Sequence, residues 1–243
     1  ILGSFLSVVI YRVPRGESIV RPGSACPACG TPLLVRDNLP VIGYLALRGR
    51  CRSCSTRIPV RYLIIELLAG ALPVLLFLRF GATAEFFVFW PLSYVLLVLS
   101  FIDLDLKILP DSVTLPGIGV GLVLGPLLHL TSGFWASVIG ALVGGGALYL
   151  IGILGELVLK KESMGGGDVK LAAMLGAFMG WQLIVLALFV AFLTGSIVGI
   201  AVIASKRSDW GKALPFGPFI ALGALVSILW GGPLLNWYSS LLG

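Results

Sequence analysis

Apolar runs long enough to cross a lipid bilayer occupy most of this sequence, and they constrain its fold more than any other feature. A transmembrane helix needs about 20 predominantly apolar residues, and this chain is 58% hydrophobic and 12% charged. The predicted spans cover residues 64–80, 84–102, 112–130, 134–159, 168–181, 183–204 and 214–241. No soluble core of a 243-residue chain could hide so much apolar surface, so we predict an all-α, polytopic membrane protein.

Three apolar stretches have special features. Residues 1–11 are too short to cross a bilayer alone and lack the basic start and cleavage site of a signal peptide. We therefore expect them to be the end of a first membrane helix that is truncated here. Segment 168–181 is also short, so we expect it to be tilted or partly buried in protein. Small residues crowd positions 140–152, where they favour close packing between helices.

A basic segment without long apolar runs separates the first stretch from the others. Residues 12–63 hold nine of the eleven arginines and all four cysteines, together with several prolines and glycines. We therefore divide the chain into the end of a membrane helix (1–11), a small cytoplasmic domain (12–63) and a multi-helix membrane domain (64–243).

The basic residues also predict an orientation in the membrane. If residues 12–63 face the cytoplasm, the alternation of spans places segments 103–111, 160–170 and 205–213 there as well. Sixteen of the seventeen Lys and Arg residues then lie on the cytoplasmic side, and Arg79 is the exception, as the positive-inside rule requires. The net charge of +6 is thus a topology signal, and we predict a lipid bilayer but no nucleic acid as a partner.

The four cysteines have the spacing of a metal site. Cys26, Cys29, Cys51 and Cys54 form the pattern C-x2-C-x21-C-x2-C, in which two short knuckles bring four thiolates around one zinc ion. Four protein ligands leave no open position, so we predict a structural rather than a catalytic zinc. Disulfides or a redox role are the alternatives, and a reducing cytoplasm disfavours them.

Two aspartates stand out beside the apolar runs. Asp103 follows span 84–102 directly, and Asp168 follows three glycines at the start of span 168–181. Ionisable groups at membrane depth are costly and indicate function. Asp105 and Asp111 have simpler explanations, as a solvated interfacial charge and as a helix N-cap, respectively. Capping is also the alternative role for Asp168.

A pair of facing carboxylates can hydrolyse a peptide bond. Two such groups disfavour double ionisation, so one is charged and activates water while the other carries a proton and polarises the carbonyl. We therefore predict an intramembrane aspartyl protease in which Asp103 and Asp168 meet. A proton-coupled transporter is the main alternative, because it also uses intramembrane acids. A zinc-binding membrane adaptor, with acids that only cap helices, is a third.

A few other residues remain as weaker candidates. Glu66 lies at the start of span 64–80 and is either a site residue or an interfacial acid. Lys170 could bias the protonation of Asp168 or simply extend to the membrane surface. The single histidine, His129, is predicted to be interfacial, and Pro215 and Pro218 are expected to break a helix.

The sequence resembles the bacterial type IV prepilin peptidases, a family of GxGD-type intramembrane aspartyl proteases. The resemblance runs through nearly the whole chain and rests on the order of its motifs. These are GSFLSVVIYRVPRGESI, CPACG, DNLPVIGYLALRGRCRSC, RYLIIE, FIDLDLKILPDSVTLP, MGGGDVKLAAMLGAFMGW and LPFGPF. By motif, the resemblance implies that Asp103 and Asp168 form the catalytic dyad, and that Asp105 and Asp111 do not belong to it.

The resemblance also implies a fold, substrates and a second activity. It implies about eight transmembrane helices, location in the bacterial inner membrane, and an active site and zinc domain that face the cytoplasm. Family members remove the basic leader from prepilins and pseudopilins, and many then methylate the new N-terminus with S-adenosylmethionine. Two departures, Ser7 for the usual Asn and Leu63 for the usual Pro, lie around the cysteine domain and weaken only the methyltransferase expectation.

Overall fold

A computed structural model describes residues 2–34, 37, 39–160, 164–205 and 214–242. Within these residues the fold is helical and contains no extended strands, which confirms the predicted all-α class. The chain forms two compact units, residues 1–102 and 103–243, with the boundary inside one helix. The division into 1–11, 12–63 and 64–243 stays a prediction. Five of the basic residues that predict the orientation lie outside the described residues: Arg36, Lys161, Lys206, Arg207 and Lys212.

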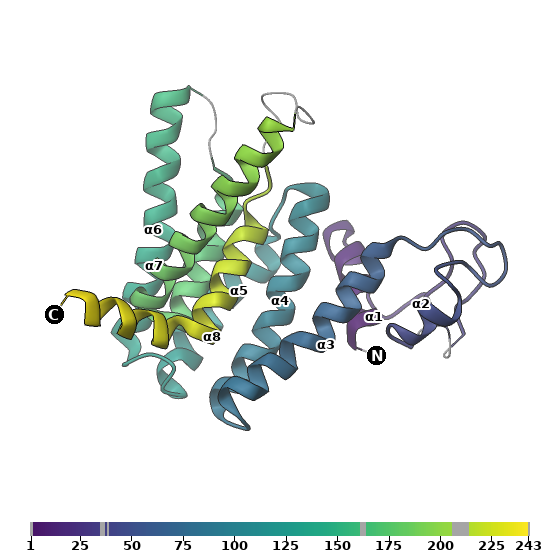
Figure 1. The fold of residues 1–243 in the computed structure, drawn as a ribbon, viewed down its shortest axis with the longest axis horizontal. Coiled ribbons are helices and arrows are strands. Elements are labelled where there is room, and N and C mark those ends of the chain that lie inside the picture. The colour runs from purple at the N-terminus through teal and green to yellow at the C-terminus, as the bar shows by residue number, and fades with distance from the viewer. Residues whose placement is uncertain (1, 35–36, 38, 161–163, 206–213, 243) are drawn as a thin grey trace. The chain divides into compact units, whose positions relative to one another are not determined.

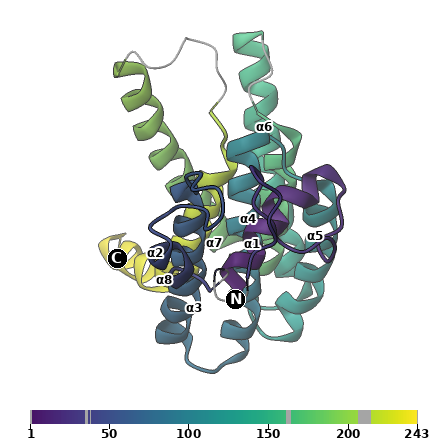
Figure 2. The same cartoon turned by 90° about the vertical axis from the view of Figure 1, so that its right-hand side faces the viewer.

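The first unit combines three apolar helices with a loop-rich segment, residues 16–59 (Figures 1 and 2). Its elements are α1 (Leu2–Arg12), the 3-10 helix η1 (Val13–Arg15), α2 (Ile42–Ala46), α3 (Val60–Phe80) and most of α4 (Ala84–Leu106). Pro59 precedes α3, and Gly81 follows it with a φ of 66°, so the helix has the usual proline start and glycine stop.

Close backbone contacts hold the helices of the first unit together. Gly3 of α1 lies so near α3 that a Cβ there would be 3.0 Å from Cα of Glu66. The hydroxyl of Tyr94 in α4 donates a 2.7 Å hydrogen bond to the carbonyl of Ala69 in α3. These contacts pair α1 and α4 with α3. In a lipid bilayer such contacts decide which helices associate, because apolar burial alone does not favour one helix pair over another.

The second unit is arranged around its longest helix. It contains α5 (Asp111–Leu127), α6 (Phe134–Leu159), α7 (Gly166–Ala204) and α8 (Gly217–Leu242). Helix α7 packs against α5, α6 and α8, and Figure 1 shows it between α6 and α8. The small residues predicted to favour packing do so: a Cβ on Gly140 of α6 would lie 2.2 Å from the carbonyl oxygen of Gly176 in α7.

Five of the described helices, α3, α4, α6, α7 and α8, are long and apolar enough to cross a membrane, so the chain is a multi-pass membrane protein. Helix α5, with 17 residues, is shorter. Helix α7 has 39 residues, but Gly180 has φ 76° and ψ 173° and separates two helical halves. The break falls where the sequence predicts one span to end and the next to begin.

Candidate functional site

Asp103 lies near the end of α4 and is almost fully buried, with 5% of its surface exposed. Its Oδ2 accepts a 2.9 Å hydrogen bond from the backbone N–H of Gly217, the first residue of α8. A Cβ on that glycine would lie 2.8 Å from the same oxygen, so only glycine allows this approach. Asp105, two residues further along, is exposed, as expected for an interfacial charge.

Asp168 lies in the first turn of α7, three residues after the N-cap position. Gly165 is the N-cap residue and makes no side-chain cap, so the alternative of an N-cap aspartate is wrong. The Oδ1 atom of Asp168 is buried and has no hydrogen-bond partner among the described residues. The glycine before it is tightly packed, because a Cβ on Gly167 would lie 2.9 Å from Cβ of Leu109.

The two aspartates belong to the same compact unit. Asp103 lies near enough to Asp168 for its charge to act there, and Lys107 is a charged group that acts on Asp103. Three chain segments therefore contribute to one polar region: the end of α4, the start of α7 and the start of α8. The catalytic role of the pair stays a prediction.

Lys170 and Asp111 form an ion pair that the sequence did not predict. The Nζ atom of Lys170 lies 2.7 Å from both carboxylate oxygens of Asp111, and both side chains are exposed. Pro110 is the N-cap residue of α5, so the prediction that Asp111 caps this helix is wrong. Asp111 is the first residue of the helix, where the helix dipole favours an acid.

The four cysteine sulfur atoms converge on one point. All four lie within 4.8 Å of one another and could hold one metal ion. Cys26 and Cys54 are 3.8 Å apart at Sγ, and Cys29 and Cys51 are 3.9 Å apart. Four sulfurs at 2.3 Å from a tetrahedral zinc would be separated by about 3.8 Å. These two separations match that value and are far too long for disulfide bonds.

The two cysteine knuckles have the same local structure. Isolated antiparallel bridges, Ala25 to Pro32 and Arg50 to Arg57, close them. In the second knuckle the Thr56 hydroxyl, 3.2 Å from Sγ of Cys54, lowers the pKa of that thiol to about 6. Thr31 lies at the corresponding position beside Cys29 and also lowers its pKa. Thiols with a lowered pKa are available as thiolates, the form that binds metal.

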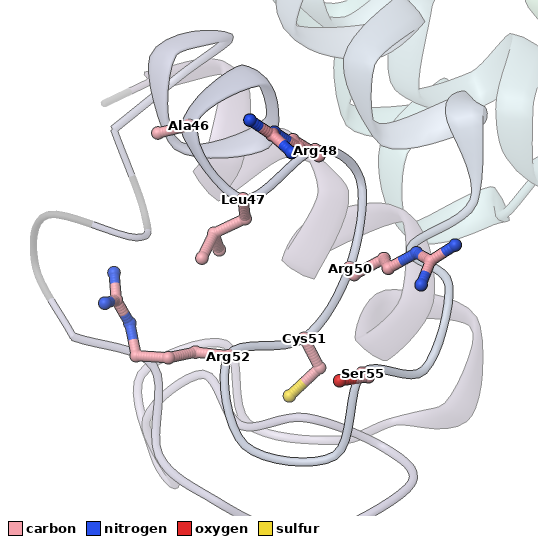
Figure 3. Close-up of a pocket in the computed structure, with 7 residues that line it drawn as sticks. All are labelled: Ala46, Leu47, Arg48, Arg50, Cys51, Arg52 and Ser55. Atoms are coloured by element: carbon pink, nitrogen blue, oxygen red, sulfur yellow. The ribbon is translucent and has the colours of Figure 1, made fainter.

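A pocket of about 630 Å³ lies beside the second knuckle and is lined by three arginines (Figure 3). The guanidinium groups of Arg48, Arg50 and Arg52 point in different directions and do not converge (Figure 3). Arg52 forms an ion pair with Asp37, whose hydrogen bonds raise the pKa of the guanidinium. The pocket is therefore not an assembled anion site, and its lining residues belong to the first unit.

Of the weaker candidates, Glu66 has a defined structural role. Its Oε2 accepts a 2.7 Å hydrogen bond from the backbone N–H of Val41, so it ties the loop-rich segment to α3. His129 is exposed in the turn after α5. Sequence reasoning missed the contact between Gly217 and Asp103, although the glycine enclosed by prolines in LPFGPF was a signal that the chain passes close to another group.

The chain has helices of membrane length, and two acids, Asp103 and Asp168, lie at the ends of two of them. This arrangement defines a candidate membrane enzyme that uses acid/base chemistry. Comparison with known proteins specifies the class further. The family model described as the bacterial Peptidase A24 N-terminal domain matches residues 1–80, and that of the type IV leader peptidase family matches residues 90–200. No solved structure matches the chain.

Similar proteins cover the whole chain. A prepilin leader peptidase/N-methyltransferase of Pseudomonas putida is 37% identical over 100% of this chain and 92% of its own length. The Aeromonas hydrophila protein of the same name is 36% identical, over 98% and 90%, respectively. That of Myxococcus xanthus is 44% identical over 88% of this chain and 62% of its own length. The chain therefore belongs to the family of the prepilin leader peptidases/N-methyltransferases, which confirms the predicted enzyme class.

Proposed function

We propose that this enzyme is an aspartyl endopeptidase that removes the basic leader peptide from type IV prepilins or pseudopilins. Its active site would be the pair Asp103 and Asp168, at the cytoplasmic face of the bacterial inner membrane. The observation that carries the proposal is that Asp103 and the Oδ1 atom of Asp168 are both buried in one compact unit, where the charge of Asp103 acts on Asp168. The names of the similar proteins supply the substrate class.

The chemistry needs only the two acids and a water molecule. The ionised carboxylate takes a proton from water as the water oxygen attacks the peptide carbonyl carbon. The protonated carboxyl donates its proton to the carbonyl oxygen, which gives a tetrahedral diol. As this intermediate collapses, the C–N bond breaks and a proton passes from the first aspartate to the departing amine. The second aspartate recovers a proton from the diol, and the pair returns to its starting state.

The positions of the acids favour a peptidase over a transporter. A proton-coupled transporter would carry its acids near the middle of the membrane, on broken helices. Asp103 lies close to the end of α4, and Asp168 lies in the first turn of α7. Helix ends are where a substrate peptide bond and water can reach the acids together.

We also propose that Cys26, Cys29, Cys51 and Cys54 bind one structural zinc ion. The sulfur separations fit a tetrahedral site, and four thiolates leave no position for a substrate or water. The ion would stabilise residues 12–63, whose described part has α2 as its only α-helix between α1 and α3.

The second proposed activity is N-methylation of the new N-terminus. The similar proteins carry this activity in their names. S-adenosylmethionine would supply the methyl group when bound, and the amine released by cleavage would accept it. We assign no residues to this donor.

The dyad is tested by incubating the purified protein in lipid nanodiscs with a prepilin-like substrate. Asp103→Asn and Asp168→Asn should each reduce cleavage at least a thousandfold, because neither amide can exchange the proton. Asp105→Asn is the matched control, because this acid is exposed two residues from Asp103, and it should cleave normally. Normal cleavage by either dyad variant would disprove the proposed mechanism.

A further inference from the structure

We infer that Gly217 is a positioning residue that keeps Asp103 as the ionised member of the pair, so that Asp168 is the acid that carries the proton. The inference rests on the proposed function and deepens it, because the dyad alone does not say which aspartate activates water. Three features of the second unit distinguish the two acids.

The first feature is a buried hydrogen bond to Asp103 from the start of α8. The backbone N–H of Gly217 points at Oδ2 of Asp103 from 2.9 Å, in a buried setting. A hydrogen bond from a backbone N–H to a carboxylate favours the charged form. The donor is also the first residue of α8, where N–H groups lack partners within the helix. Asp103 therefore satisfies an unpaired donor of the helix while it gains a partner for its charge.

The second feature is the missing partner at Asp168. Its Oδ1 is buried without a hydrogen bond among the described residues, which is costly for a carboxylate and acceptable for a carboxyl group awaiting a substrate carbonyl. Asp168 also lies in the first turn of a helix, so the helix dipoles alone do not distinguish the two acids. The backbone N–H of Gly165 also acts on Asp168, so the unpaired Oδ1 of Asp168 is what distinguishes it from Asp103.

The third feature is the distribution of nearby cations. Lys107 lies one turn beyond Asp103, and its backbone N–H donates to the Asp103 carbonyl at 2.9 Å. Lys170, two residues beyond Asp168, lies 2.7 Å from both oxygens of Asp111 and is engaged there. The groups that act on the pair from α4, α7 and α8 thus place the negative charge on Asp103.

Removing the N–H of Gly217 tests the inference. Gly217→Pro deletes the donor, and a proline is tolerated at the first residue of a helix. It also adds a Cβ that would lie 2.8 Å from Oδ2 of Asp103, so Gly217→Ala, which adds the same Cβ and keeps the N–H, is measured beside it. Val60→Pro is the matched control, because Val60 is the exposed first residue of α3. Cleavage of a prepilin-like peptide by the full chain in nanodiscs is measured as kcat/KM against pH. We expect the acid limb of the Gly217→Pro profile to lie about one pH unit above that of Gly217→Ala, and that of Val60→Pro to stay at the wild-type position.

The outcomes separate this inference from the proposed function. The same acid limb in Gly217→Pro and Gly217→Ala, with Asp103→Asn inactive, would overturn the role of Gly217 and leave the dyad intact. Normal cleavage by Asp103→Asn would overturn the proposed function itself.

A measurement without turnover covers the case in which Gly217→Pro is inactive. Infrared spectra at neutral pH should show a protonated carboxyl band that Asp168→Asn removes and Asp103→Asn retains. The reverse pattern would assign the proton to Asp103 and disprove the inference.

Discussion

Glu66 holds Val41 in a conformation that a valine rarely adopts. The Glu66 carboxylate accepts the backbone N–H of Val41 at 2.7 Å. Val41 has φ 62° and ψ −50°, and the N–H of Ile42 donates to the carbonyl of Pro40 at 2.6 Å. These values describe a γ-turn with a positive φ, which is strained for a β-branched residue. A helix residue thus compensates the strain of the turn that leads into α2.

Loss of this carboxylate should loosen the loop-rich segment. We expect Glu66→Ala to lower the free energy of unfolding of the first unit by about 1–3 kcal/mol, because a partly buried N–H loses its partner. Glu66→Gln keeps an acceptor oxygen and should cost less than half as much. Thermal unfolding in detergent and the rate of proteolysis within residues 16–59 measure the effect. Equal stability of Glu66→Ala and the wild type would contradict this role.

The ion pair between Lys170 and Asp111 should contribute little to stability. Both side chains are exposed, and exposed pairs contribute about 0–1 kcal/mol because water and salt screen them. A double-mutant cycle with Lys170→Met and Asp111→Asn should give a coupling free energy below about 1 kcal/mol that falls further in high salt. A coupling above about 2 kcal/mol would show that the pair is much less hydrated than its exposure indicates.

The contact between α6 and α7 depends on the absence of a side chain at Gly140. A Cβ there would lie 2.2 Å from the carbonyl oxygen of Gly176, so Gly140→Ala must push the helices apart. We expect a loss of about 1–3 kcal/mol in the free energy of unfolding. Gly146→Ala in the same helix meets nothing within 4 Å and serves as the control. If both variants melt at the same temperature in detergent, the packing described for α6 and α7 is wrong.

Loss of the metal should leave peptide-bond cleavage intact. Cys51→Ser removes one of four sulfur ligands, so bound zinc measured by mass spectrometry should fall from one ion per chain to below a tenth of that value. The melting temperature should fall as well, whereas cleavage should continue at a rate within about threefold of the wild type because the closed site does no acid/base chemistry. Complete loss of cleavage in a folded Cys51→Ser protein would show that the metal supports the active site.

Much of the fold could be predicted from hydropathy because the bilayer permits few alternatives. Apolar runs of sufficient length must be helices, and the predicted spans coincide with α3 to α8, including the division of α7 at Gly180. The cysteine cluster could be predicted because its pattern is local, with each knuckle closed within a few residues. Both kinds of signal are contained in short stretches of sequence.

Contacts between distant segments could not be predicted in the same way. Gly217 and Asp103 are 114 residues apart, and nothing near either residue specifies the other. Lys170 and Asp111 are 59 residues apart, and each had a plausible local role as an interfacial charge or a helix cap. Helix capping was predicted from residue type, whereas the structure places Pro110 and Gly165 at the cap positions. Pro110 lies one residue before Asp111, and Gly165 lies three residues before Asp168. Each helix therefore starts before its acid, and the acid lies inside the first turn.

The break at Gly180 bears on how deep water must enter the membrane. Residues 166–179 form the half of α7 that carries Asp168. At 1.5 Å per residue they extend about 21 Å, whereas the hydrocarbon core of a bilayer is about 30 Å thick. A half-helix anchored at the far headgroups therefore ends about 9 Å short of the near ones. Local thinning of the bilayer around α7 would close this gap, so lipid thickness itself becomes a variable that sets the hydration of Asp168.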